Sequence, residues 1–151
     1  MNHKALSTLD DFNYWVADMD DTLERFFAML PPDVQGKLDY TPASLNALEG
    51  WILQNYATPQ ELLAPDQTAK LDGAARYFGE TFRKTLGGYW DIDLDNPKNV
   101  YFGVPVVTGY NERPTPIAPI RMVPTAAHHR TGEFLRTLVQ NYQEGLLRKK
   151  P

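Results

Sequence analysis

Residues 66–94, DQTAKLDGAARYFGETFRKTLGGYWDIDL, contain the change of pattern that decides the fold. Up to Leu86 the apolar residues recur every three or four positions, which is the period of a helix with one buried face. After Gly87 and Gly88 the pattern alternates between apolar and polar residues, as it does in a strand with one buried face. The segment therefore predicts a long helix, a glycine stop and a strand, and it places the chain in the α+β class.

The chain before this segment is predicted to be helical. Residues 7–30 carry apolar side chains at helical spacing, and Pro31 and Pro32 end that helix because neither can donate a backbone hydrogen bond. A second helix is predicted at 42–56, and the capping box of residues 58–61 opens a short helical turn. Three helical segments therefore precede the long helix.

The rest of the chain is predicted to complete a small sheet and to end in a helix. The runs 100–107 and 117–123 are rich in β-forming residues, and together with 89–94 they indicate an antiparallel meander. Prolines interrupt the second and third runs, so these strands are expected to be short, bulged or at an edge. Thr131 can cap a last helix. The whole pattern predicts one domain over residues 1–151, with four or five helices packed on a short, mostly antiparallel three-stranded sheet.

The composition excludes several classes of protein. The chain has 151 residues, a net charge of −4 and no cysteine, which excludes disulfides, thiolate metal sites and cysteine nucleophiles. No apolar run approaches the roughly 20 residues of a membrane helix, and the first residues lack the apolar stretch of a signal peptide. We therefore expect a cytoplasmic protein without a membrane partner.

The charge is distributed unevenly along the chain. Residues 1–72 hold twelve acidic and four basic residues, whereas residues 73–151 hold seven acidic and eleven basic ones. A net acidic chain with scattered basic residues repels phosphate backbones, so nucleic acid is not an expected partner. In the predicted first helix the acidic residues lie opposite the apolar stripe; they are Asp10, Asp11, Asp18, Asp20, Asp21 and Glu24. This side is either a solvated surface or a docking site for a basic partner.

Glu49 breaks the pattern of its helix. In the segment 42–56 it falls within the flank of the apolar stripe, close to Leu45 and Tyr56 on the helical wheel. Its carboxylate is either partly buried and held by an arginine or an indole N–H, or exposed with Leu53 as part of a docking surface. The sequence leaves both interpretations open.

The aspartates at 91, 93 and 95 have the spacing of the first ligands in a calcium loop. Such a loop also needs a glycine at its sixth position and a bidentate glutamate at its twelfth, where this chain has Asn96 and Phe102. We therefore assign Asp91, Asp93 and Asp95 to the solvent face of a strand.

His128 and His129 are adjacent, so in an extended segment their side chains point to opposite sides. A zinc site needs three or four converging ligands, and His3 is the only other histidine. The pair is assigned to a surface loop before the last helix, and the sequence indicates no metal and no other cofactor.

Two further patterns have structural interpretations. Arg76, Glu80 and Lys84 stand four residues apart on the long helix, which predicts a surface ladder of ion pairs opposite the apolar stripe. Gly79 lies at the margin of that stripe, where a missing side chain lets a neighbouring strand or helix approach closely. We therefore expect no buried catalytic carboxylate on this helix.

The residues around the glycine stop resemble a known kind of protein. YFGE at 77–80, LGGYW at 86–90 and the following strand with Pro105 are similar to small acidic bacterial domains of uncharacterised or immunity type. In those domains a helix with an internal glycine leads through a Gly-Gly turn into a strand that carries a tryptophan. The resemblance covers residues 70–107. It implies a protein that neutralises a secreted toxin by binding it, and it implies no catalytic residue.

The sequence favours a non-enzymatic cytoplasmic binding protein, an immunity-like inhibitor that uses acidic and aromatic surface to cover a basic partner such as a toxin domain. The expected partner-binding residues are Asp18, Asp20, Asp21, Glu24 and Glu49. Two alternatives remain. One is a small hydrolase or isomerase that uses carboxylates such as Glu49, Asp91 or Asp93. The other is a subunit of a homo-oligomer, for instance a homodimer, that covers a broad apolar face.

Overall fold

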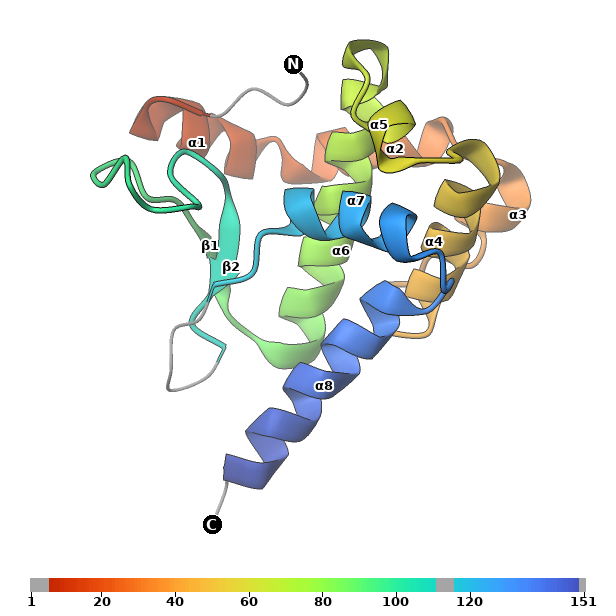
Figure 1. Cartoon of the computed structure of the whole chain (residues 1–151). Helices are drawn as coiled ribbons and strands as arrows, with labels where there is room; N and C mark the ends of the chain where they lie inside the picture. Colours follow the sequence, from red (N-terminus) through yellow and green to blue (C-terminus); the bar gives the residue numbers. More distant parts are fainter. Residues whose placement is uncertain (1–5, 111–115, 150–151) are drawn as a thin grey trace.

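The computed structural model describes residues 6–110 and 116–149, with side chains to residue 145, and its elements surround one long helix (Figure 1). Before that helix come α1 Leu9–Ala17, α2 Met19–Ala28, α3 Pro32–Gln35, α4 Ser44–Asn55, α5 Pro59–Leu62 and the 3₁₀ helix η1 Pro65–Gln67. The long helix is α6, Thr68–Leu86, and after it come β1 Tyr89–Asp91, β2 Val106–Thr108, α7 Pro119–His129 and α8 Phe134–Lys149. The α+β class is thus confirmed, with helices dominant.

Helix α6 is the central element of the fold. α2, α7 and α8 contact it, while α4 lies against α7 and α8. Figure 1 shows α7 crossing α6, α8 running obliquely away from it, and the strands and α4 on opposite sides of it in this view. Trp15 of α1 contacts Trp90 of β1. The molecule therefore has two regions: one where α4 meets α7 and α8, and one where α1, α2 and β1 meet α6.

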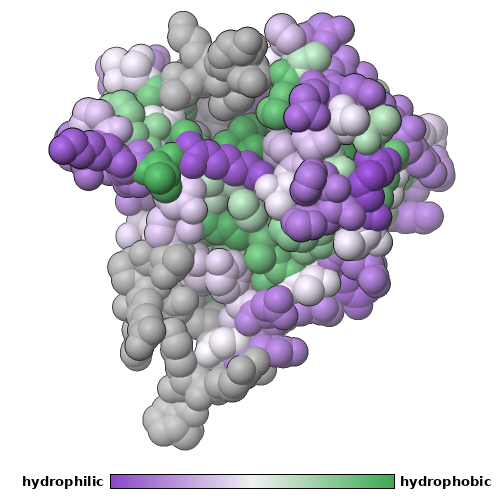
Figure 2. Space-filling view, viewed as in Figure 1, coloured by the Kyte–Doolittle hydropathy of each residue, from purple (hydrophilic) through white to green (hydrophobic). Residues whose placement is uncertain are grey.

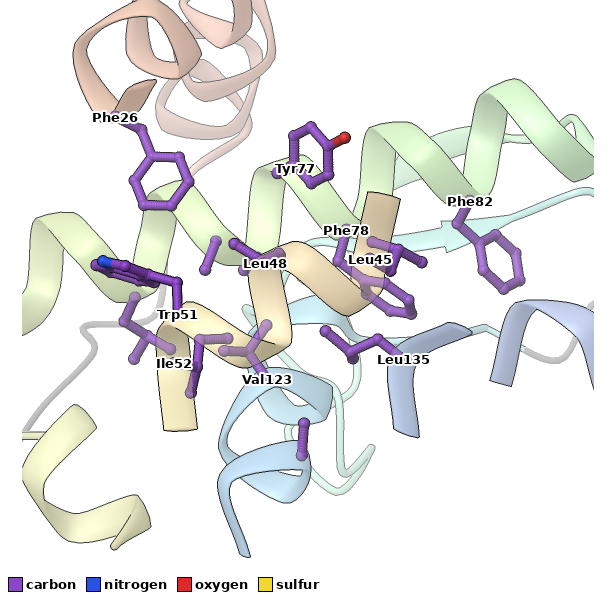
Figure 3. Packing of buried hydrophobic residues seen from close by; sticks show 14 of the residues in the cluster. Phe26, Leu45, Leu48, Trp51, Ile52, Tyr77, Phe78, Phe82, Val123 and Leu135 are labelled. Atoms are coloured by element: carbon purple, nitrogen blue, oxygen red, sulfur yellow. The ribbon is translucent and has the colours of Figure 1, made fainter. Parts of the chain in front are cut away.

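The core lies between α2, α4, α6, α7 and α8. Figure 3 shows side chains from these helices directed into one interior, among them Phe26, Leu48, Tyr77, Phe78 and Leu135, all of which are fully buried. Burial of a large apolar side chain of this kind contributes about 1.5–3 kcal/mol to stability. The long helix predicted at 66–86 is therefore confirmed as α6, although it begins at Thr68, and its predicted stripe is buried from Leu71 to Phe82.

Apolar residues also reach the surface between α7 and α8. Figure 2 shows them in the middle of the face seen in Figure 1, with hydrophilic residues around them. Apolar surface of this kind is common on folded proteins and identifies no ligand by itself. In the described part of the chain, no helix has both the length and the apolar composition to cross a membrane.

The helix predicted at 7–30 is two helices, because the chain bends at Asp18. This residue has φ −87° and ψ 9°, which lie outside the helical range, and it separates α1 from α2. Aspartate favours such breaks because its side chain offers the backbone local alternatives to the helical ladder. The bend brings Trp15 and Met19 over the same side chain of α6, that of Arg76.

The third strand predicted at 117–123 is instead the start of α7. Pro119 occupies the first turn of this helix, where an N–H would have no helical partner. Val123, Ala126 and Ala127 are buried at helical spacing, so the core-facing pattern continues past the end of the predicted strand. The split first helix, the short α3 and α7 raise the number of described α-helices to eight, against the four or five predicted.

The described sheet has two strands and not three. β1 and β2 pair antiparallel, with Trp90 opposite Val107 at the centre. Ile117, from the predicted third strand, adds only a single bridge to Val107. β1 is also shorter than predicted, because the chain leaves the strand after Asp91. The sheet is thus a small ribbon beside α6, where Trp90 lies over Gly79, and not a layer of its own (Figure 1).

Candidate functional site

The side of α6 that faces α1, α2 and β1 carries charged residues. The surface ladder predicted for Arg76, Glu80 and Lys84 is wrong, because Arg76 is 4% exposed and Glu80 is 9% exposed. Their ion-pair partners are Asp72, 2.8 Å from Arg76, and Arg83, 2.7 Å from Glu80. The helical wheel placed these residues opposite the apolar stripe correctly, but other elements cover that side as well.

Arg76 holds α1 against α6. Its Nε donates to Asp72, its Nη1 donates to the backbone oxygen of Trp15 at 2.8 Å, and its guanidinium carbon lies 4.0 Å from the centre of the Trp15 ring. The indole Nε1 of Trp15 donates in turn to the Asp72 carboxylate at 3.3 Å. An arginine keeps its charge when buried, so these acceptors and the ring replace the water that it loses. The network therefore fixes the end of α1 on α6.

Glu80 is the corresponding anchor for β1. Its Oε2 accepts hydrogen bonds of 2.7 Å from Trp90 Nε1 and from Arg83 Nη1. The Trp90 ring lies edge-on to the ring of Trp15, with centres 4.8 Å apart. Gly79 makes room for this arrangement, since a Cβ at that position would overlap the Trp90 ring. The predicted close approach at Gly79 is therefore confirmed.

A hollow of about 230 Å³, which we call the indole hollow, opens beside Glu80. Its wall includes an indole ring, apolar side chains and three charged groups; the main lining residues are Val16, Met19, Asp20, Glu80, Arg83 and Trp90. Within the described part of the chain, Oε1 of Glu80 accepts no hydrogen bond, whereas Oε2 accepts two. Two carboxylates and one guanidinium give the hollow a net charge of −1, which favours a cationic ligand.

The predicted acidic residues of α2 have different roles. Asp18, at the bend, is partly buried and accepts hydrogen bonds from Thr22 Oγ1 at 2.7 Å and from Arg25 Nη2 at 3.1 Å. The Thr22 hydrogen bond, reinforced by Arg25, holds the pKa of Asp18 below its ordinary value. The exposed acids are Asp20, Asp21 and Glu24. Asp18 is therefore engaged within the helix, and the other three are available to a partner.

Apolar residues lie exposed on the neighbouring helix. On α1, Tyr14 is 72% exposed and Leu9 is 59% exposed. Tyr14 stands three and four residues after Asp11 and Asp10, so the three side chains share one side of α1. We call the exposed part of α1 and α2 the acidic face; it consists of Leu9, Asp10, Asp11, Tyr14, Asp20, Asp21 and Glu24. Sequence reasoning missed Tyr14, although its position outside the apolar stripe was a usable signal.

Glu49, the fifth predicted site residue, is fully buried and cannot contact a partner. Its Oε1 accepts the backbone N–H of Leu135 at 2.9 Å, and its Oε2 accepts that of Phe134 at 3.0 Å. These N–H groups begin α8 and have no carbonyl partner within the helix, whose positive end also favours a carboxylate. The docking interpretation is therefore wrong. The buried interpretation is confirmed, with backbone amides in place of an arginine or an indole.

Arg130 also holds α4 in place, but it is a donor that lies outside α4, whereas Glu49 is an acceptor that lies on it. Arg130 follows α7 in a left-handed conformation with φ 58°, and its guanidinium donates to backbone oxygens at the end of α4. The acceptors are Leu53 at 2.9 Å, Tyr56 at 3.0 Å and Ala57 at 2.9 Å. Glu49 and Arg130 thus bind α4 to the start of α8 and the end of α7, and each charge meets a helix end of opposite sign.

The carboxylates at 91, 93 and 95 do not share one face of a strand, because β1 ends at Asp91. Asp93 instead closes a turn, since it accepts the backbone N–H groups of Asp95 and Asn96 and the side-chain amide of Asn99. The Asn99 hydrogen bond, followed by the two backbone ones, holds the pKa of Asp93 below its ordinary value. Asp91 and Asp93 border a second hollow of about 160 Å³, but both oxygens of Asp93 are already engaged.

His128 and His129 are in the last turn of α7 and not in a loop. Both are exposed, as predicted, and the His129 ring stacks on Phe134 with ring centres 5.2 Å apart. In residues 6–110 and 116–149, no three histidine, aspartate or glutamate side chains converge closely enough to hold a metal ion.

The acidic face and the indole hollow adjoin each other, because Asp20 belongs to both. The resemblance of residues 70–107 to immunity-type domains stays a prediction. Compared with known proteins, this chain matches no family model, no curated protein and no solved structure.

Proposed function

We propose that this chain is a non-enzymatic binding protein whose acidic face docks on a basic surface of a partner protein. The observation that carries the proposal is the exposed aromatic ring of Tyr14 on the same side of α1 as Asp10 and Asp11, with further exposed carboxylates on α2, the next helix. An immunity-like inhibitor of a bacterial toxin, acting in the cytoplasm, is the form of this function that the sequence resemblance and the cysteine-free composition favour.

The charge of the acidic face supports a basic partner. Residues 9–28 carry six carboxylates and one basic residue, Arg25, which is paired with Asp18. Five carboxylates therefore remain without a basic neighbour in that segment. Their mutual repulsion is relieved when a basic surface binds, and opposite charges also speed the encounter of two proteins in a salt-dependent way.

Tyr14 supplies the apolar contact that charge alone does not. Large aromatic side chains are enriched among the residues that dominate binding energy, and polar residues typically surround them as a rim. Leu9 is a second exposed apolar residue of α1, and Asp10 and Asp11 share the side of α1 that carries Tyr14. The acidic face thus combines an aromatic anchor with a charged rim.

The alternative of a carboxylate-dependent enzyme gains less support. Glu49 is closed off beneath α8, and both oxygens of Asp93 already accept hydrogen bonds. General acid or base catalysis needs a carboxylate that can reach a substrate proton. The homo-oligomer alternative would cover the apolar surface between α7 and α8 (Figure 2). Sedimentation of the purified chain tests that alternative, and a monomer removes it.

The proposal is tested with a charge-reversal variant and a matched control. The variant replaces three acids of the acidic face with lysine: Asp20, Asp21 and Glu24. The control replaces three exposed acids elsewhere with lysine: Asp33, Asp66 and Asp95. Both variants have the same net charge, so a difference between them reports the position of the charge and not its amount.

The measurement is the rate of association with a partner captured from the native host with the wild-type chain and then purified. We expect the acidic-face variant to associate about tenfold more slowly or worse and to lose most of the salt dependence, while the control changes much less. Tyr14→Ala should mainly speed dissociation, because it removes apolar contact and not charge. Equal association rates for the two charge variants overturn the proposal.

A further inference from the structure

The indole hollow contains a carboxylate with one oxygen engaged and the other available. Trp90 and Arg83 hold Oε2 of Glu80, and Oε1 accepts no hydrogen bond from any described residue. Because Glu80 is otherwise buried, Oε1 is reached from the hollow that the residue lines. Oε1 is not among the buried atoms that lack a partner, so it is open to solvent in the hollow. A ligand that donates a hydrogen bond can take the place of water at this charged acceptor.

Asp20 brings a second acceptor to the same hollow from a different helix. The rest of the wall consists of the Arg83 guanidinium, which is paired with Oε2 of Glu80, and of apolar or aromatic side chains, among them Val16, Met19 and Trp90. An aromatic face attracts a cation, and apolar side chains suit the methylene stem of a long basic residue. The hollow therefore offers acceptors for a positive head and apolar contacts for the chain that carries it.

We propose that the indole hollow receives the side chain of a lysine from the partner protein. An ammonium group is a compact charge with three donors, so it can serve two separate oxygens, one from Asp20 and one from Glu80. The fork of an arginine prefers both oxygens of one carboxylate, and at Glu80 one of the two is already held. The inference rests on the proposed function, since the lysine arrives with a partner that covers the acidic face.

The test uses Nα-acetyl-lysine methylamide, whose side-chain ammonium group is free, as the probe. It is titrated into the full chain without any partner. The indole N–H signal of Trp90 is followed by NMR, because that group donates to Glu80 at the wall of the hollow. N-acetyl-norleucine methylamide is the uncharged control, and N-acetyl-arginine methylamide compares the two cations. We expect a saturable shift with the lysine probe, weaker binding of the arginine probe and no shift with the norleucine probe.

Two variants of α2 locate the binding. Asp20→Asn should weaken binding of the lysine probe about fivefold, which corresponds to the roughly 1 kcal/mol of a favourable exposed ion pair. Asp21→Asn removes the same charge from the same helix outside the hollow and should weaken binding clearly less than Asp20→Asn does, because only the more distant attraction is lost. Glu80→Gln keeps an acceptor for Trp90 but removes the charge, and it should also weaken binding; the same spectrum shows whether this variant is folded.

Several results would overturn the inference. One is a Trp90 signal that does not respond to the lysine probe or responds equally to the norleucine probe. Another is tighter binding of the arginine probe than of the lysine probe. A third is an equal affinity of Asp20→Asn and Asp21→Asn for the lysine probe. The titration needs no partner, whereas the association experiment with the charge-reversal variants does. Each experiment can therefore fail while the other succeeds, so failure of this inference is distinguishable from failure of the proposed function.

Discussion

Glu49 and Glu80 are both buried carboxylates on central helices, yet they serve the two regions of the molecule differently. Glu49 binds two backbone N–H groups at the start of α8, and both of its oxygens are engaged. Glu80 binds two side chains, Trp90 and Arg83, through one oxygen and presents the other to the indole hollow. The first contact uses the whole carboxylate, and the second leaves half of it available.

The difference shows that burial alone does not separate a structural carboxylate from one that can bind a ligand. Backbone N–H groups are fixed by the helix that carries them, so the contact of Glu49 has one arrangement. Side-chain donors can rotate, and Arg83 is partly exposed, so the surroundings of Glu80 can adapt to a ligand. The identity of the donors and the access to the second oxygen decide which role a buried carboxylate has.

The largest effect should come from Glu49→Ala. It leaves two buried N–H groups without an acceptor, and each costs about 1–3 kcal/mol, so the free energy of unfolding should fall by about 3 kcal/mol or more in urea denaturation. Glu133→Ala removes an exposed carboxylate beside the same helix end and should lower it by less than about 1 kcal/mol. Similar losses in the two variants would show that α8 does not need the buried cap.

Gly79→Ala should have the next largest effect, in the region of Glu80. The new Cβ overlaps the Trp90 ring, so we expect a loss of about 1–2 kcal/mol after the gain in helix propensity, with a change in tryptophan fluorescence. Gly50→Ala on α4 meets nothing within 4 Å and should stabilise the protein by up to about 1 kcal/mol. If Gly79→Ala stabilised as Gly50→Ala does, Trp90 would not be fixed against α6.

The variants Glu80→Gln and Glu49→Gln compare the two buried carboxylates directly. For Glu80→Gln we expect a loss of only about 1 kcal/mol, because the amide oxygen still accepts from Trp90 and the lost ion pair involves a partly exposed arginine. Glu49→Gln should lose about 2 kcal/mol or more, because a glutamine has one acceptor oxygen for two N–H groups. Denaturation curves of both variants measure this difference, and equal losses would remove the distinction between the two sites.

The smallest expected effect is a change in the pKa of Asp18, a partly buried carboxylate that can be compared with the buried Glu49 and Glu80. Thr22→Val should raise the pKa of Asp18 toward its ordinary value of 3.8, because the Thr22 hydrogen bond is the largest single cause of the shift, and Arg25→Gln should raise it as well. NMR titration of the Asp18 carboxyl carbon measures both changes. An unchanged pKa in Thr22→Val would contradict the role of this hydrogen bond.

The same shift sets the pH dependence of stability. The pKa of Asp18 is lower in the folded chain than its ordinary value, so its contribution is fully present above about pH 3.8 and is lost as the pH falls through the folded value. Thr22→Val should therefore reduce the loss of stability as the pH falls below about 3.8, as acid unfolding curves would show. Identical curves would mean that the hydrogen bond does not persist in solution.

Part of the fold could be predicted from the sequence because some helices carry complete stripes. The segments 42–56 and 66–86 and the last helix as far as residue 145 place most of their stripe residues in the core or packed against it, as predicted. The start of α7 could not be predicted, because residues 117–123 combine β-forming side chains with prolines. The helical period becomes clear only when Ala126 and Ala127 are included.

The candidate site could be predicted only where it depends on local exposure. The exposed acids of α2 follow from the helical wheel, which shows which side of a helix is polar. The wheel does not show whether another element covers that side, and so the exposure expected for Arg76 and Glu80 was wrong although their side of the helix was right. The amides that bind Glu49 lie 85 and 86 residues further along the chain, at a distance where spacing carries no signal.

At position 130 the backbone conformation favours glycine, whereas the hydrogen bonds of the side chain require arginine. The left-handed conformation suits glycine and is unfavourable for arginine by about 1 kcal/mol, but glycine would leave the carbonyl oxygens at the end of α4 without their donors. The acceptors are backbone oxygens, which every residue type carries, so the contact constrains position 130 and not the side chains at 53–57. Related chains, when aligned, should therefore keep arginine at position 130 while positions 53–57 vary.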